Sequence, residues 1–399
     1  MKTLYLCYFG LREPLVQTQV LPYLRELRAG GIEVYLLTFE PDLRTKFTAE
    51  DRQTWQNKLA ADGIRWSTLA YHKRPTLPAT LFDIAQGALV ASRLIRREKI
   101  DVVHTRSQIP ALMGLMIQRA TGCKFVFDVR GLIAEEYVDS GIWTEDSLTF
   151  RAVKSVERAA MKHADQLIVL THRLSDYLSA QGLASADKIE VIPCCVDFTR
   201  GAELASPAQS GDDRFELVYA GSTSGLYLVE EMGKFFVALR ARRPDAFFRV
   251  LTQGDPARVQ TIFGQLGLPV ESYSVGSAAP AEVPALLRRA RLGVSFRKST
   301  FSQIGASPTK IPEYLSVGLP VVCNAGIGDM DALVSTEKVG VVVSSFGASD
   351  LQRAVDESLA LLEDSTLRDR CVRVARAEFD LKQVGGPRYR HVYQRLGAL

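Results

Sequence analysis

The sequence contains no uninterrupted apolar stretch of about 18 residues, the length that a membrane-spanning helix needs. Its first segment, MKTLYLCYFGLREP, combines one lysine with a short apolar run, which favours a first β-strand over a secretion signal. Like charges are not gathered in a block, and the net charge is only +4, so no nucleic-acid-binding tail is indicated. We expect a cytoplasmic protein without a nucleic-acid partner, and the small basic excess leaves peripheral association with the inner face of a membrane open.

The six cysteines show no spacing typical of a metal site. Cys194 and Cys195 are adjacent, while Cys7 and Cys323 lie in strand-like apolar runs. We therefore expect buried free thiols in a reducing compartment, and no bound metal.

Short apolar runs alternate with amphipathic helical segments along the chain, which predicts an α/β fold with doubly wound parallel sheets. The stretch DFTRGAELASPAQSGDDR is polar and without periodicity, so it reads as a linker, after which the alternation restarts at FELVYAG. A chain of 399 residues is also long for one core. We predict two Rossmann-like domains that face a central cleft, over residues 1–200 and 213–380, with a C-terminal helix at 384–399 packing back on the first.

Ligands of open α/β sheets bind at the carboxyl ends of the strands, so residues after the strands are the candidates for function. In the second domain Gly221 and Ser222 form a small-residue turn before a helix, where backbone N–H groups are suited to phosphate. The alternative is a tight turn that needs glycine for its backbone angles. The spacing is not G-x-G-x-x-G, which disfavours a nicotinamide dinucleotide. Arg297 and Lys298 follow another strand and could neutralise a diphosphate, a solvated loop being the alternative.

The most specific segment is SPTKIPEYLSVGLPVV. Thr309 is a predicted N-cap, which places Pro312 in the first helical turn, where its missing N–H costs little. Lys310 lies in the same turn and opposes the helix dipole, so its position makes sense if an anionic ligand binds there. Glu313 follows one turn later and could accept two hydrogen bonds from the vicinal hydroxyls of a ribose. Ordinary surface exposure of both side chains is the alternative.

Two strand ends of the first domain carry charged residues. We predict that Asp128 and Arg130 face the cleft, and the alternative is an internal salt bridge that holds their loop. A single histidine after a strand, such as His104, is more often structural, although its near-neutral pKa leaves acid/base chemistry open. Arg106 and Glu135 are further charged candidates after these two strands.

The segment KIPEYLSVGLPVV resembles the donor site of retaining glycosyltransferases of family 4, which have the two-Rossmann GT-B fold. ADQLIVLTHRLSDYL, KIEVIPCCVD and VPALLRRARLGVSF resemble the same family in the same order, so the resemblance covers nearly the whole chain. It implies that Glu313 holds the ribose of a nucleotide-sugar, and that Ser307, Thr309 and Lys310 lie at its diphosphate.

The chain departs from the family pattern at two places. Many members carry two glutamates separated by seven residues, and the first of these positions is Gly305 here. The usual arginine after the first strand of the second domain is Ser222, and the lysine a few residues later is missing. We expect Arg297, Lys298 or Lys310 to supply the missing positive charge.

The resemblance implies a hexosyltransferase that moves a sugar from a nucleoside-diphosphate sugar to a glycan, lipid-linked or small-molecule acceptor in glycan biosynthesis. It further implies retention of anomeric configuration and no metal or other cofactor. The catalytic candidates are Asp128, Arg130 and Lys310. The acceptor-side candidates are Arg12, His104, Arg106 and Glu135. Two alternatives remain, a GT-B nucleotide-sugar epimerase with acid/base carboxylates and a non-catalytic two-domain binding protein.

Overall fold

The computed structural model describes residues 1–41, 43, 47–199, 214–279 and 281–397. The described chain forms two compact units, one made of Met1–Pro193 with Leu381–Leu399 and the other of Cys194–Asp380. Most of the predicted linker, residues 200–213, lies outside the described residues. Each unit contains one parallel sheet, so the predicted pair of parallel-sheet α/β folds is confirmed.

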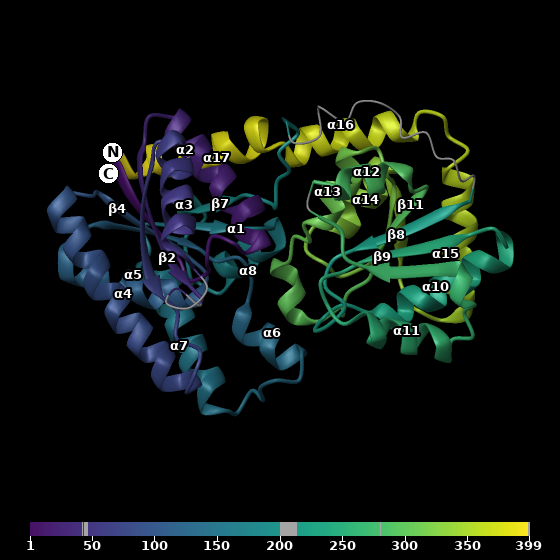
Figure 1. The fold of residues 1–399 in the computed structure, drawn as a ribbon, viewed down its shortest axis with the longest axis horizontal. Coiled ribbons are helices and arrows are strands. Elements are labelled where there is room, and N and C mark those ends of the chain that lie inside the picture. Colours follow the sequence, from purple (N-terminus) through teal and green to yellow (C-terminus); the bar gives the residue numbers. More distant parts are fainter. Residues whose placement is uncertain (42, 44–46, 200–213, 280, 398–399) are drawn as a thin grey trace. The chain divides into compact units, whose positions relative to one another are not determined.

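The first unit is built on a seven-stranded sheet with the order β3-β2-β1-β4-β5-β6-β7. Figure 1 labels β2, β4 and β7 of this sheet. The central strand β4 is buried at every residue, although His104, Thr105 and Arg106 make up three of its five positions. The strands are β1 Lys2–Cys7, β2 Glu33–Glu40, β3 Ile64–Ala70, β4 Val102–Arg106, β5 Lys124–Asp128, β6 Gln166–Val169 and β7 Ile189–Val191.

Some helices of the first unit begin at a residue whose side chain caps the backbone. Thr48 and Asp51 form a capping box, and Thr171 accepts a hydrogen bond from the backbone N–H of Leu174. Gly114 lets its helix approach β5, because a Cβ at this position would lie 2.5 Å from the Phe125 ring. The helices are α1 Pro14–Gln19, α2 Leu21–Ala29, α3 Ala49–Ala61, α4 Thr76–Glu98, α5 Gln108–Thr121, α6 Ile133–Asp139, α7 Leu148–His163, α8 His172–Ala180 and η1 Ala186–Lys188.

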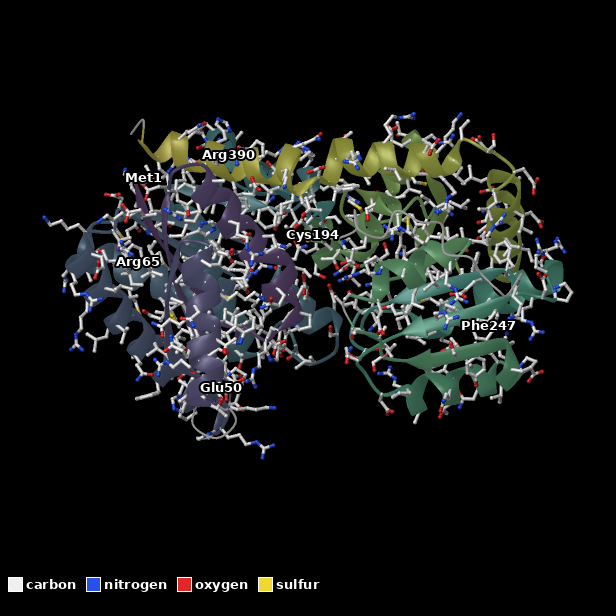
Figure 2. The ribbon with its side chains drawn as sticks, turned by 45° about the horizontal axis from the view of Figure 1, so that its top comes forward. Met1, Glu50, Arg65, Cys194, Phe247 and Arg390 are labelled. Atoms are coloured by element: carbon white, nitrogen blue, oxygen red, sulfur yellow. The ribbon has the colours of Figure 1, made fainter. Side chains whose placement is uncertain are left out.

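The C-terminal segment returns to the first unit as a π-helical turn, η4 Leu381–Gly385, followed by α17 Gly386–Gly397. Tyr389 and Tyr393 of α17 are buried, and Arg390 forms an ion pair with Glu26 of α2 at 3.0 Å. Figure 2 shows the side chain of Arg390 on this helix. The segment that ends the chain therefore supplies part of the core of the domain that begins it.

The second unit contains a six-stranded sheet with the order β10-β9-β8-β11-β12-β13. Phenylalanines such as Phe235, Phe248 and Phe263 fill one core cluster, and Tyr314 belongs to a second. The strands are β8 Glu216–Ala220, β9 Phe247–Leu251, β10 Tyr273–Gly276, β11 Leu292–Ser295, β12 Val321–Asn324 and β13 Gly340–Val343. The helices are α10 Val229–Arg242, α11 Pro256–Gln265, η2 Val270–Ser272, α12 Val283–Arg289, η3 Phe301–Gly305, α13 Lys310–Ser316, α14 Met330–Glu337, α15 Ala348–Leu361 and α16 Leu367–Phe379.

Strand order reverses once in each sheet, between β1 and β4 in the first unit and between β8 and β11 in the second. Ligands of open parallel sheets bind beside the carboxyl ends of the strands at such a reversal. The topology therefore predicts ligand-binding residues after β8 and β11 in the second unit, and after β1 and β4 in the first.

All six cysteines are free and buried, as predicted. Among the described residues, none of the helices combines the length and the hydropathy needed to cross a bilayer.

Candidate functional site

Lys310, the first residue of α13, points its ammonium group at two tyrosines near the reversal in the second sheet. Its Nζ lies 4.0 Å from the centroid of the Tyr227 ring and 5.2 Å from that of Tyr219. The residue is only 3% exposed, so the alternative of ordinary surface exposure is wrong for Lys310. A buried ammonium needs compensation, and two aromatic faces supply part of it.

Gly221 lies directly against this lysine. A Cβ at position 221 would be 2.8 Å from Cε and 2.9 Å from Nζ of Lys310, closer than side-chain contacts allow. Its φ of 152° is also one that residues with a side chain rarely adopt. Glycine is therefore needed for the turn after β8 and for the room that Lys310 occupies.

Arg297 follows β11 and contacts the same tyrosine. Its Nη1 donates to the Tyr227 hydroxyl at 3.1 Å, its Nε donates to Gln303 Oε1 at 2.8 Å, and its Cζ lies 4.8 Å from the Tyr227 ring centroid. In the described part of the chain, neither Arg297 nor Lys310 forms an ion pair with a carboxylate. Two cations thus share one aromatic ring, and neither has an ion-paired carboxylate among the described residues.

Burial dominates the electrostatics of this cluster. It lowers the pKa of Lys310, while the hydroxyl of Tyr227 and the charge of Glu313 act in the opposite direction. It raises the pKa of Glu313 to about 7, and the charge of Lys310 opposes that rise. Glu313 is therefore poised between its protonated and ionised forms near neutral pH.

The loop after β11 is held by Asn324 at the end of β12. Asn324 Oδ1 accepts from the backbone N–H of Arg297 at 2.8 Å, and Nδ2 donates to the carbonyl of Arg297 at 3.0 Å. The backbone N–H of Lys298 donates to the carbonyl of Leu226 at 2.8 Å. These hydrogen bonds fix the backbone position of Arg297.

The remaining predicted donor-side residues lie on the same unit in different settings. Ser307 is buried, and its hydroxyl accepts from the backbone N–H of Cys194 at 3.1 Å. Thr309 occupies the predicted N-cap position of α13 without a side-chain capping bond, and Pro312 lies in the first turn as predicted. Ser222 is exposed, and its carbonyl accepts a hydrogen bond from the Tyr219 hydroxyl.

Sequence reasoning missed four residues of this cluster, namely Tyr219, Tyr227, Gln303 and Asn324. Tyr219 and Asn324 stand in the last residues of β8 and β12, at the edge where ligands bind, and that position was a usable signal. Tyr227 and Gln303 lie in connecting segments, and their roles depend on contacts with Arg297 that no local pattern indicates.

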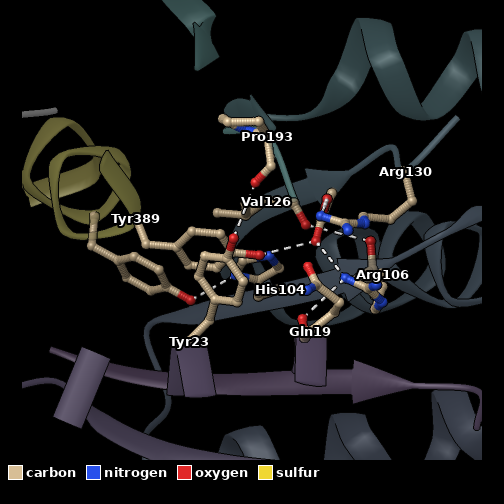
Figure 3. Close-up of polar contacts among 11 residues, drawn as sticks. Gln19, Tyr23, His104, Arg106, Val126, Arg130, Pro193 and Tyr389 are labelled. Atoms are coloured by element: carbon tan, nitrogen blue, oxygen red, sulfur yellow. Dashed lines mark hydrogen bonds and ion pairs between the residues drawn. The ribbon is translucent and has the colours of Figure 1, made fainter. Parts of the chain in front are cut away.

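In the first unit, Asp128 is fully buried. Figure 3 shows its labelled neighbours Arg106, Arg130 and Tyr389. Asp128 Oδ2 accepts from the Tyr389 hydroxyl at 3.0 Å and from Arg106 Nη1 at 3.3 Å, and Arg130 Nη1 lies 3.7 Å from Oδ1. Arg130 itself has a φ of 60°. The geometry matches the alternative of an internal ion-pair network that holds the loop.

His104 belongs to the same buried cluster. Its Nδ1 lies 2.8 Å from the Tyr393 hydroxyl, and its ring stacks on Tyr389 with centroids 5.6 Å apart. Burial lowers the pKa of His104 to about 4, so the imidazole is neutral at physiological pH. This environment fits the structural alternative for His104.

Two further acceptor-side candidates stand apart from this cluster. Glu135 is paired with Lys154 at 2.5 Å. Arg12 is half-exposed, pairs with Asp51 at 2.8 Å and lies over the Phe47 ring at 4.9 Å. The structure therefore brings Asp128, Arg130, His104 and Arg106 together, and places Glu135 and Arg12 elsewhere.

No group of three or more His, Cys, Asp or Glu side chains in the described chain is arranged to hold a metal ion. The sequence does contain a D-x-D triplet, Asp329-Met330-Asp331, at the start of α14. The Asp331 carboxylate accepts from the backbone N–H groups of Gly326 and Ala332, each at 3.0 Å, and so caps local backbone.

Comparison with known proteins finds similar sequences and structures. Residues 16–195 match the family model described as the glycosyl transferase 4-like domain. A curated relative, 2-deoxystreptamine glucosyltransferase from Streptomyces kanamyceticus, is 26% identical over 279 residues, which cover 67% of this chain and 70% of that protein.

Solved structures match over the full length. Sucrose-phosphate synthase from Thermosynechococcus elongatus has a TM-score of 0.72 at 17% identity, with 100% of this chain and 99% of that chain covered. Anabaena HepE in complex with UDP-glucose has a TM-score of 0.69 at 15% identity, with 100% of both chains covered. A candidate UDP-N-acetylglucosamine 2-epimerase from Listeria monocytogenes scores lower, at 0.60 and 15% identity, over 98% of this chain and 95% of that one. The structural matches confirm the GT-B fold class. The family model and the curated relative support a glycosyltransferase at the general level.

Proposed function

We propose that the protein transfers a hexosyl group from a nucleoside-diphosphate sugar to a hydroxyl group of an acceptor, with retention and without a metal, in glycan or glycoconjugate biosynthesis. One observation carries the proposal. Lys310 and Arg297 are held on one tyrosine ring at the reversal of the second sheet, and neither is paired with a described carboxylate.

The cost of this arrangement argues for an anionic ligand. Removing an ammonium from water without a partner of opposite charge costs several kcal/mol, of which cation–π contacts return about 2 kcal/mol. A diphosphate supplies the missing negative charge through charge-assisted hydrogen bonds. Gly221, which has no side chain, leaves room for Lys310 beside the turn after β8.

Glu313 is the proposed ribose ligand. It lies one turn along α13 from Lys310, and in its ionised form it accepts hydrogen bonds from two vicinal hydroxyls. With a pKa of about 7, it is roughly half ionised at neutral pH before the ligand binds.

The same cations serve the chemical step. When the bond between the anomeric carbon and the diphosphate breaks, negative charge grows on the leaving oxygen. Cations already held in place stabilise this charge more than that of the bound donor, which lowers the barrier. The resemblance to retaining enzymes supports retention, and no protein nucleophile is assigned.

The comparisons suggest which ligands to try first. HepE is solved with UDP and UDP-glucose, so uridine is the first base and glucose the first sugar. The curated relative is named for glucosyl transfer to 2-deoxystreptamine, so an aminocyclitol is a first acceptor.

Calorimetric titration with UDP, GDP, ADP and dTDP tests the donor site. We expect one of the four to bind, and to raise the melting temperature as its concentration passes the dissociation constant. A transfer assay with UDP-glucose and a panel of 2-deoxystreptamine, free hexoses and short oligosaccharides tests the reaction. Failure of every nucleotide to bind at millimolar concentration would refute the proposal. Conversion of the sugar nucleotide itself without an acceptor would instead favour an epimerase.

A further inference from the structure

A histidine–aspartate pair that no part of the proposed donor site uses lies after β3, at the carboxyl-terminal edge of the first sheet. His72 Nδ1 lies 2.6 Å from Oδ1 of Asp83 on α4. Asp83 Oδ2 accepts from the backbone N–H of His72 at 3.0 Å and from the Tyr8 hydroxyl at 2.8 Å. Tyr8 follows β1, so the pair joins two strand ends and a helix.

This geometry selects one tautomer of the imidazole. Asp83 is fully buried, and its Oδ2 already has two donors, so Oδ1 accepts from His72. The proton of the neutral ring therefore sits on Nδ1, which leaves the lone pair on Nε2. Within the described chain, no group lies within hydrogen-bonding distance of Nε2, and the His72 side chain is 35% exposed. The pair thus presents an oriented hydrogen-bond acceptor to the outside.

The surroundings are apolar and aromatic. Phe82 packs edge-on against the His72 ring with centroids 5.2 Å apart and is itself 53% exposed. Tyr71 packs edge-on against Tyr8 at 5.3 Å. Aromatic side chains therefore flank the fixed polar groups of the pair.

A purely structural reading explains only part of this arrangement. Tethering the end of β3 to α4 needs the backbone N–H of His72, the Tyr8 hydroxyl and the buried carboxylate. This tether does not need the partly exposed His72 ring, whose Nε2 is left as a hydrogen-bond acceptor. That nitrogen suits a ligand that donates a hydrogen bond, and an acceptor sugar or cyclitol carries hydroxyl groups that do so.

We propose that His72 Nε2 accepts a hydrogen bond from a hydroxyl group of the acceptor, and that Asp83 positions the imidazole for this role. The inference rests on the proposed function and adds an acceptor subsite to it. His72 binds and orients the hydroxyl group, and Asp83 acts through His72.

Nitrogen NMR of protein labelled at its five histidines tests the tautomer without any ligand. In spectra of the neutral ring, identified in a pH series, we expect the His72 signals to report the proton on Nδ1. His72→Asn assigns these signals by their loss, and Asp83→Asn should shift the proton toward Nε2. A wild-type His72 that carries its proton on Nε2 would overturn the inference.

Kinetics with His72→Asn test the role. The asparagine amide can replace Nδ1 as the donor to Asp83, so the tether is kept while the Nε2 acceptor is lost. Loss of one hydrogen bond to the substrate predicts a fall of about tenfold in kcat/KM for the best acceptor of the panel. The dissociation constant for UDP should stay within about twofold, because the donor site lies on the other unit. His163→Asn, at an exposed histidine, is the matched control and should leave both values unchanged.

The outcomes separate the two proposals. If no nucleotide binds, or if the wild type transfers to no acceptor of the panel, the proposed function fails and the subsite fails with it. If wild type binds UDP and transfers glucose, and His72→Asn transfers as fast with the same acceptor KM, the proposed function stands and the subsite is refuted.

Discussion

Replacing Lys310 with methionine should make the protein more stable and its nucleotide binding weaker. Methionine fills a similar volume without the charge. The lysine is 3% exposed, lies in the first turn of α13 and has no described carboxylate within ion-pair distance. Its burial therefore costs several kcal/mol, the helix dipole adds about 0.3–1 kcal/mol, and the contact with Tyr227 returns about 2 kcal/mol.

These terms leave a net gain of about 2 kcal/mol in the free energy of unfolding of Lys310→Met. For a domain of this size, about 2 kcal/mol corresponds to a rise of roughly 4–8 °C in melting temperature, measured by calorimetry without ligand. Loss of a charge-assisted hydrogen bond to the diphosphate is worth about 1.5–3 kcal/mol, so UDP should bind roughly 10- to 150-fold more weakly.

The pH dependence gives a second signature. Burial lowers the pKa of Lys310 in the folded protein, so between that pKa and the ordinary value near 10.5 the unfolded chain binds more protons than the folded one. Stability contributed by this group therefore rises with pH through that window. The difference in free energy of unfolding between Lys310→Met and wild type should be largest at neutral pH and should shrink as the pH approaches 10.

Lys234→Met is the matched control. Lys234 is partly exposed and paired with Glu230 and Glu231, so its loss should cost less than about 1 kcal/mol and leave UDP binding unchanged. The reasoning is refuted if Lys310→Met lowers the melting temperature and binds UDP as tightly as wild type, since Lys310 would then be a structural group.

Three further results are expected. First, the affinity of wild type for UDP should rise by up to about tenfold between pH 6 and 8, because Glu313 loses its proton in this range. This rise is measured relative to Glu313→Gln, whose pH dependence comes from the phosphate of UDP. Gly221→Ala should lower stability by about 1–3 kcal/mol through its positive φ, and weaken UDP binding by displacing Lys310. Tyr389→Phe should lower the melting temperature of the first unit by about 4–8 °C, because the buried Asp128 carboxylate loses a hydrogen-bond donor. Tyr137→Phe, at an exposed site, is the control and should leave the melting temperature unchanged.

Titration with UDP or thermal denaturation can contradict each of these three predictions. Equal pH profiles for wild type and Glu313→Gln would remove Glu313 from the ribose site. An alanine at 221 that binds UDP normally would show that Lys310 does not need its observed position. Equal melting temperatures for the two tyrosine variants would mean that Asp128 does not depend on α17.

Much of the fold could be predicted because its signal is local. A strand buried on both faces reads as a continuous apolar run, and helices between such strands predict parallel sheets. The donor-side segment could be predicted for a similar reason. Lys310 and Glu313 are three residues apart on one short helix, so their spacing alone places them one turn apart.

Burial at the first sheet could not be predicted in this way. Asp128 and Tyr389 are 261 residues apart, and His104 and Tyr393 are 289 apart. Whether a charged residue after a strand faces a ligand or is covered depends on which distant helix packs there. Tyr389 and Tyr393 of α17 contact Asp128 and His104, which are both fully buried. Figure 3 shows Tyr389 beside His104.

The sequence by itself determined the class of fold, the strand ends at which polar residues accumulate, and a helix start where Lys310 opposes the dipole. Only the tertiary structure decided which of those polar residues are enclosed, which two cations share the ring of Tyr227, and that His72 is oriented by a buried aspartate. The division has a physical reason. Backbone periodicity is set by neighbours a few residues away, whereas charge compensation, burial and the choice of tautomer are set by contacts between segments that are distant in the chain.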